Sequence, residues 1–272
     1  MPLPQMIIDR YARLREWYAR NAQVADVLYP KPASLENVRI LCFGPDAAVN
    51  LGQANYALYL PDRPRGRMQA QSIQKCMNDY NETYGPPPEY PMPEYLLYEP
   101  GSQSDPPSGA PPRFHLPVIL VRCPPSWLDD LQDAEVNFRS AMVPLHEMGH
   151  ALLGLADPKH QGEPFAYWIE VRTILRFVET TVPSNGSYAN PLVGITTTAQ
   201  AIANYIVGRA EQFGLAVTPD EREVRSTGLP DTIDRIAATL QAAGLPEFSV
   251  TALNQQAARL RQLKPSVTAD RR

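Results

Sequence analysis

Apolar residues recur along this chain with two different spacings, which together predict an α+β fold. Short apolar runs bounded by glycine, proline or aspartate predict strands at residues 38–43, 56–60 and 117–122. Helical spacing predicts helices at about residues 5–28, 67–81, 136–154 and 164–180, and three more near 197–213, 230–243 and 250–263. The pattern therefore predicts a small mixed β-sheet followed by a mainly helical C-terminal lobe. We expect two subdomains, at residues 1–155 and 156–272.

A proline-rich stretch interrupts the first subdomain. Residues 86–112 hold ten of the 29 prolines in the chain. Proline fixes φ and has no N–H, so this stretch predicts an extended surface loop and excludes a helix or a central strand. Its role stays open between a spacer, a cover over a cleft and a polyproline II segment for a partner.

Composition is ordinary for a globular protein and excludes some partners. Hydrophobic residues make up 44% and charged residues 20%, with a net charge of −4. No block of lysine and arginine stands out, so nucleic acid is not an expected partner. No apolar run approaches the roughly 20 residues of a membrane helix, so no membrane partner is expected either. With no signal-peptide core, we expect a cytoplasmic protein, with non-classical secretion as an alternative. Cys42, Cys76 and Cys123 have no CxxC spacing and are predicted to be reduced, buried thiols.

The strongest chemical signal is the run His146-Glu147-Met148-Gly149-His150 inside an apolar stretch. On a helix, His146 and His150 lie one turn apart and can bind one metal ion together. Glu147 lies about 100° around the helix axis from His146 and can reach a water on that metal. The alternative without a metal is a pair of ordinary buried histidines, but three polar groups buried without partners would cost several kcal/mol. Pro144, two residues before His146, predicts that the helix either begins late, near Ala141, or bends there.

A catalytic zinc ion needs a third protein ligand, and four residues are candidates: Asp157, His160, Glu163 and Glu170. Glu170 has the best physical case, because it lies in the middle of an apolar helical face and needs a partner there. A buried Glu170 paired with an arginine is the competing interpretation. Glu163 lies on the same face two turns earlier, at the expected helix start, where an acidic residue can also be a plain cap.

Residues 117–180 resemble the zincin metallopeptidases, whose HExxH motif is His146 to His150 here. The 19 residues between His150 and Glu170 resemble the gluzincin arrangement, in which a second helix supplies a glutamate ligand. The resemblance implies one catalytic Zn²⁺ held by His146, His150 and Glu170. Two positions depart from the gluzincin pattern: Ile169 replaces an expected asparagine, and Ile174 replaces the aspartate that would orient a histidine.

A second zincin group, the metzincins, resembles the chain less well. Its pattern would place a glycine at position 153 and a ligand at 156, where this chain has Leu153 and Ala156, and no methionine follows Met148 to form a methionine turn. Asp157 or His160 would be the ligand in that case.

The zincin resemblance implies a zinc-dependent peptidase acting on a peptide or protein. Glu147 would be the general base, and residues 118–121 would form an edge strand above the cleft. Tyr167, Tyr188 and Tyr205 are candidate oxyanion donors by residue type alone. Two alternatives stay open: a catalytically inactive zincin-like protein that binds peptide, and a metal-dependent hydrolase of a non-peptide bond.

Overall fold

The computed structural model describes residues 9–14, 16–17, 38–45, 51, 56–60, 75–76, 79, 82, 118–130, 132–156, 163–213 and 228–262. Within them the fold is α+β. One sheet contains β1 (Arg39–Phe43), β2 (Ala57–Leu60) and β3 (Val118–Arg122), and a hairpin contains β4 (Ser187–Asn190) and β5 (Ile195–Thr198). The helices are α5 (Pro125–Asp129), α6 (Ala134–Ala156), α7 (Glu163–Thr180), α8 (Ala199–Phe213), α10 (Leu229–Ala242) and α11 (Glu247–Gln262).

The three-stranded sheet is mixed, with the strand order β1-β3-β2. β3 pairs with β1 in parallel and with β2 in antiparallel fashion. Its residues Val118 to Val121 are all buried, as expected of a strand covered on both faces and hydrogen-bonded along both edges. The expectation that residues 118–121 form the edge strand is therefore wrong. Within the part of the chain that the structure describes, β2 is the edge strand next to α6.

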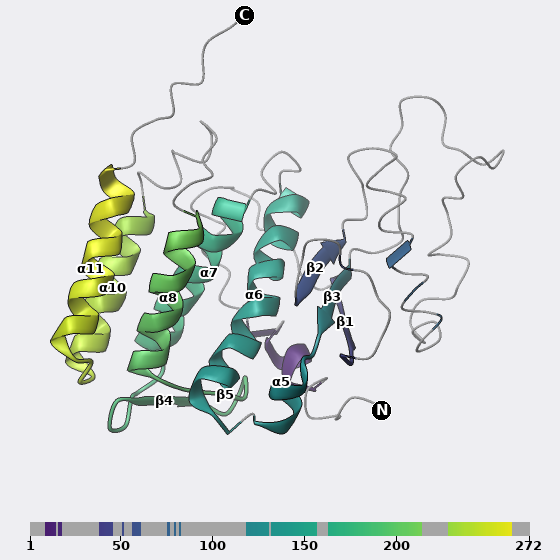
Figure 1. Ribbon diagram of the computed structural model, residues 1–272, viewed down its shortest axis with the longest axis horizontal. Coiled ribbons are helices and arrows are strands. Elements are labelled where there is room, and N and C mark those ends of the chain that lie inside the picture. Colours follow the sequence, from purple (N-terminus) through teal and green to yellow (C-terminus); the bar gives the residue numbers. More distant parts are fainter. Residues whose placement is uncertain are drawn as a thin grey trace, which may run out of the picture.

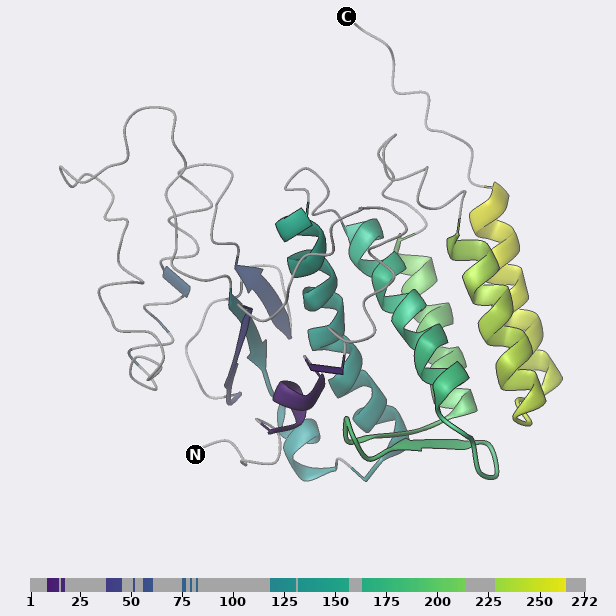
Figure 2. The same cartoon turned by 180° about the vertical axis from the view of Figure 1, so that it is seen from behind.

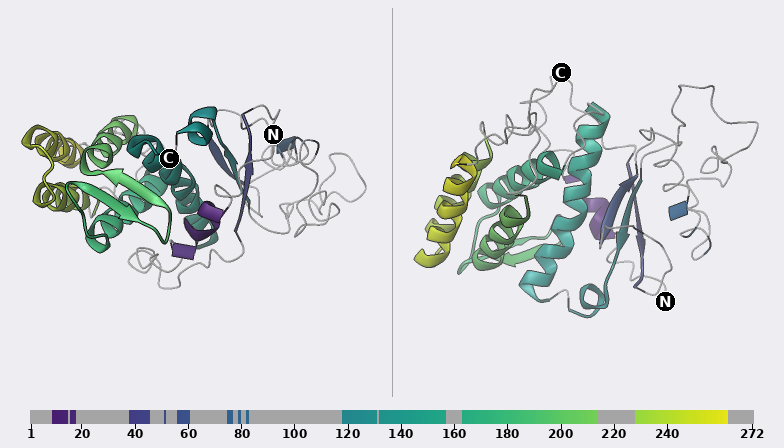
Figure 3. Two further views of the ribbon diagram at one scale, coloured as in Figure 1. Left: turned by 90° about the horizontal axis from the view of Figure 1, so that it is seen from below. Right: turned by 45° about the horizontal axis from the view of Figure 1, so that its top comes forward.

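The molecule is built in layers that begin at the sheet and end at a helical pair. α6 lies against the sheet, α7 and α8 lie beyond it, and α10 with α11 form the far end (Figure 1). Figure 3 shows α10 and α11 side by side at the end opposite the sheet. Both helices bury an apolar stripe at helical spacing. Its members are Leu229, Ile233, Ile236, Ala237 and Leu240 on α10, and Val250, Leu253, Ala257 and Leu260 on α11.

Helix α6 is the centre of the fold. Asp133 begins it as an N-cap, because its Oδ1 accepts the N–H groups of Glu135 and Val136 at 2.9 and 2.8 Å. The helix continues through Pro144 without ending, so the alternative of a late start near Ala141 is wrong. The helix, predicted to end at residue 154, continues two residues further, to Ala156.

A tyrosine from the N-terminal segment compensates for Pro144. Proline has no N–H for the carbonyl of Ser140, four residues earlier, and its ring displaces that carbonyl. The hydroxyl of Tyr11 donates to the Ser140 carbonyl at 3.3 Å instead. Arg10, which is also buried, donates to Ser140 Oγ at 2.8 Å and to the Asn137 carbonyl at 2.6 Å. Figure 2 shows this N-terminal segment, in purple, beside α6.

We therefore expect Tyr11→Phe to lower the free energy of unfolding by about 1 kcal/mol, the usual net contribution of one hydrogen bond. The loss should shrink in a Pro144→Ala background, where residue 144 regains an N–H for the Ser140 carbonyl. Urea denaturation of the four members of this double-mutant cycle measures the coupling. Equal losses in both backgrounds would contradict the compensation.

Most predicted helices and strands are confirmed to within a few residues at each end. The predicted helices at about 5–28 and 67–81 lie mostly outside the described residues, although residues 9–14, 16–17, 75–76, 79 and 82 are helical. The proline-rich residues 86–112 lie wholly outside them. α5 and the β4–β5 hairpin were not predicted, and the division at residue 155 stays a prediction.

The structure also describes the hydropathy of the helices and the state of the cysteines. Among the described residues, no helix is both long and apolar enough to cross a membrane. Cys76 and Cys123 are buried, Cys42 is half-buried, and all three are free thiols.

Candidate metal centre

The HExxH residues gather on one side of α6, as predicted. The rings of His146 and His150 lie edge to face, with centroids 4.9 Å apart. One ligand atom from each of His146, Glu147 and His150 lies within 4.8 Å of the others. Both histidines are buried and Glu147 is half-buried. These three residues form a group that could hold a metal ion.

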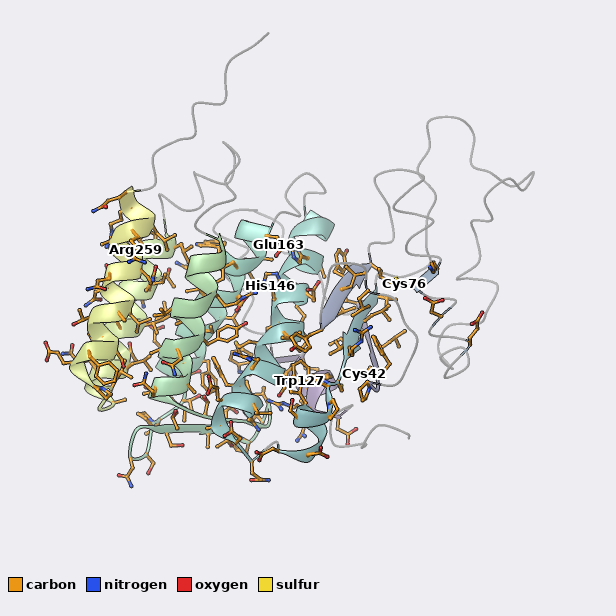
Figure 4. The ribbon with its side chains drawn as sticks, viewed as in Figure 1. Cys42, Cys76, Trp127, His146, Glu163 and Arg259 are labelled. Atoms are coloured by element: carbon orange, nitrogen blue, oxygen red, sulfur yellow. The ribbon has the colours of Figure 1, made fainter. Side chains whose placement is uncertain are left out.

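Helix α7 places a carboxylate next to the Nε2 atoms of both motif histidines. Glu163, the first residue of α7, has one oxygen 2.9 Å from Nε2 of His146 and the other 3.5 Å from Nε2 of His150. Figure 4 shows Glu163 and His146 close together, one on α7 and one on α6. The Glu163 side chain remains 61% exposed, so the atoms that converge there are open to solvent on one side.

Glu170 contacts the opposite nitrogen of the same histidine. Its Oε2 lies 2.8 Å from Nδ1 of His146, and its side chain is fully buried. Arg209 of α8 approaches the pair, with a terminal nitrogen 3.5 Å from Glu170 Oε2 and 3.1 Å from His146 Nδ1. Glu170 is therefore buried as expected, and both a histidine and an arginine accompany it.

The charges of this cluster favour a cation between the carboxylates. Burial alone would lower the pKa of His146, but hydrogen bonds with Glu163 and Glu170 outweigh it and raise the pKa to about 9. Hydrogen bonds from His146 and His150 hold the pKa of Glu163 well below its usual value. Burial would raise the pKa of Glu170, but Arg209 and His146 hold it below the ordinary value. A proton on His146 supplies the positive charge here, and a metal ion at Nε2 would replace it.

Gly149, inside the motif, lets α7 approach α6 closely. A Cβ at this position would lie 3.1 Å from both Cα and the carbonyl oxygen of Ala166 on α7. These are backbone atoms, which cannot swing aside as a flexible side chain can. The absent side chain of Gly149 therefore sets the helix separation at which Glu163 and Glu170 meet His146.

We expect Gly149→Ala to lower the free energy of unfolding by about 1–2 kcal/mol, because the overpacking cost exceeds the helix-propensity gain of about 1 kcal/mol. Gly208→Ala on α8 is the matched control, since no atom of the described residues lies within 4 Å of its added Cβ. That variant should gain stability. Thermal or urea unfolding checks both variants, and a stabilising Gly149→Ala would show that the two helices are free to separate.

A cavity of about 540 Å³ opens beside the motif between α6, α8 and β2. His146, Glu147 and Glu163 line one part of it, and Arg209 and Tyr205 line the α8 side. The rest is partly apolar, with Phe138, Val143, Ala201, Tyr56 and Ala57 in the wall. Tyr56 stacks on the buried Trp127, with ring centroids 5.5 Å apart. Side chains that can bind a metal, those of His146, Glu147 and Glu163, thus line a cavity that is large enough for part of a peptide.

A backbone hydrogen bond from the sheet fixes the Glu147 carboxylate. Its Oε2 accepts the backbone N–H of Tyr59, in β2, at 2.8 Å. The contact joins residues 88 positions apart, and no feature of the sequence pointed to it. Arg209 was also missed, because an arginine on a C-terminal helix gives no sign in the sequence of which carboxylate it will meet.

The other candidate ligands and oxyanion donors differ in where they lie. Asp157 and His160 lie outside the described residues. Tyr205 lines the cavity, whereas the Tyr167 hydroxyl donates to the Ile206 carbonyl at 3.2 Å and Tyr188 is buried in the β4–β5 hairpin. Of the three tyrosines considered as oxyanion donors, only Tyr205 lies in the cavity wall.

No protein-family model, no curated protein and no solved structure matches this chain. The central helix of this α+β fold thus carries a largely buried His-Glu-His group that could hold a metal ion.

Proposed function

We propose that this protein is a zinc-dependent metallopeptidase of gluzincin-like architecture, with His146, His150 and Glu163 as the zinc ligands. The observation that carries the proposal is the position of Glu163, whose two oxygens face Nε2 of both motif histidines at 2.9 and 3.5 Å. Two imidazole nitrogens and one carboxylate are a typical donor set of catalytic zinc, which leaves one coordination position for water.

This assignment moves the third-ligand role from Glu170 to Glu163. Glu170 lies on Nδ1 of His146, the nitrogen that would face away from a metal bound at Nε2. A metal-binding histidine usually donates its other N–H to a carboxylate, which fixes its tautomer and ring orientation. Glu170 supplies that carboxylate, which explains why the aspartate expected at the position of Ile174 is not needed.

The same residues support a hydrolytic reaction. Zinc, when bound, polarises a substrate carbonyl and lowers the pKa of a water molecule. Glu147, half-buried in the cavity wall, would accept the proton of that water and transfer it to the leaving nitrogen. When a metal replaces the proton on Nε2, Glu170 would keep the other proton of His146 on Nδ1 and so leave the Nε2 lone pair for the metal.

A peptide is the substrate that fits the neighbouring strand. Ala57 of the edge strand β2 lines the cavity together with Tyr56, and an extended peptide can add to such an edge by main-chain hydrogen bonds. The partly apolar wall of the cavity then receives a substrate side chain.

Anomalous diffraction at the zinc edge tests the proposal, together with hydrolysis of fluorescently labelled casein. We expect one zinc ion per chain, contacted by His146, His150 and Glu163, and hydrolysis that a chelator stops and added zinc restores. Zinc without hydrolysis of casein or of a broad peptide mixture would favour the non-peptide hydrolase. Absence of zinc would leave an inactive zincin-like protein.

A further inference from the structure

The general base proposed above is anchored by the main chain of another part of the fold. Glu147 Oε2 accepts the Tyr59 N–H at 2.8 Å, within the usual range for a hydrogen bond to a charged acceptor. The donor is a backbone amide in a strand, so its position is fixed by the sheet and not by a side-chain rotamer.

The pairing of β2 with β3 shows why this amide points toward α6. In an antiparallel pair, residues alternate between those whose N–H and C=O face the partner strand and those whose groups face away. The Tyr56 carbonyl accepts the Arg122 N–H at 2.7 Å, so Tyr56 faces β3. Tyr59, three residues later and opposite Ile119, therefore faces away from β3. Within the described strands, the Tyr59 N–H therefore lies outside the β2–β3 ladder, and Glu147 accepts it.

We infer that the backbone N–H of Tyr59 is a positioning group for Glu147, an inference that rests on the proposed peptidase function. A glutamate side chain has several accessible rotamers, and fixing one carboxylate oxygen on a rigid donor selects among them. The second oxygen is then left to exchange the proton with water and the leaving nitrogen. Small displacements of a catalytic group cost large factors in rate, so this anchor acts on kcat and not on substrate binding.

A backbone N–H can be deleted without touching any side chain. Incorporating the α-hydroxy acid analogue of tyrosine at position 59 replaces the amide N–H with an ester oxygen. The matched control is the corresponding ester at Leu58, whose N–H faces β3. It weakens the sheet while leaving the Tyr59 N–H in place. Tyr59→Phe, which keeps the amide, controls for the side chain, and Tyr59→Pro is a simpler second variant, tolerated where a strand edge leaves an N–H outside the ladder.

With labelled casein as the probe, we expect the ester at 59 to lower kcat by about 10- to 100-fold, the loss typical of one hydrogen bond to a charged group. KM should stay within about twofold and zinc content at the wild-type value, whereas the ester at 58 should leave kcat near wild type. An unchanged kcat for the ester at 59, or equal losses for both esters, would overturn the inference. A wild-type protein without zinc or hydrolysis would instead overturn the peptidase proposal.

A second measurement on the metal-free protein needs no activity. Combining the ester at 59 with Glu147→Ala, which removes the acceptor, in a double-mutant cycle of urea unfolding isolates the contact itself. We expect the two changes to be coupled by about fivefold or more in the unfolding equilibrium constant, since each removes one half of the same charged hydrogen bond. Additive effects would show that the contact is absent in solution and would reject the positioning role.

Discussion

Glu147→Gln is expected to abolish hydrolysis, lowering kcat by about 10³-fold, the middle of the range for loss of a general base. Glutamine has nearly the same shape and can still accept the Tyr59 N–H, but it cannot take a proton from water. Glu147 is not among the proposed zinc ligands, so one zinc ion per chain should remain bound. Hydrolysis of labelled casein and the metal content of the same sample measure the two effects.

Measuring hydrolysis and zinc content on the same sample distinguishes a general base from a metal ligand at position 147. If kcat falls and zinc is lost together, Glu147 holds the metal and its role as a base is wrong. If hydrolysis persists at more than about a tenth of the wild-type rate, another group in the cavity removes the proton.

Glu163→Gln is expected to weaken zinc binding by more than about 100-fold, because it removes the one charged ligand in the proposed set. Glu170→Gln should weaken binding less, by about 10-fold, the lower end of the range for an outer carboxylate on a histidine. The smaller loss follows because glutamine can still accept the Nδ1–H of His146 while its negative charge is gone. Competition with a chromophoric chelator measures both affinities.

A third variant controls for general effects on α7. Glu179 lies on the same helix, is exposed and pairs with Arg235 of α10, far from the motif in sequence. Glu179→Gln should leave zinc affinity unchanged. The reverse order, with Glu170→Gln more damaging than Glu163→Gln, would restore the ligand assignment that the sequence favoured.

The motif and its helix were predictable because their signals are local. The spacing of His146 and His150 places both on one helical face whatever surrounds the helix. The burial of Glu170 could also be predicted, since the residues on its own side of α7 are apolar. The β4–β5 hairpin could not, because its strands have only four residues each and the polar sequences SYAN and ITTT.

Helical periodicity alone could not predict which of two carboxylates on α7 is the third metal ligand. Glu163 and Glu170 lie seven residues apart on one face of α7, so any helical projection treats them alike. Their distinction depends on the angle and separation at which α7 crosses α6, which the contact between Gly149 and Ala166 sets. That contact places Glu163 on Nε2 and Glu170 on Nδ1 of the same ring.

The sequence by itself determined that two imidazoles and a carboxylate share one turn of a largely buried helix, and that acidic residues follow within reach. Only the tertiary structure decided which acid faces which nitrogen, that Arg209 accompanies Glu170, and that a strand amide holds Glu147. The physical reason is range: helical periodicity fixes neighbours three or four residues apart, whereas these contacts join residues 17 to 88 positions apart through the packing of α7, α8 and β2 around α6.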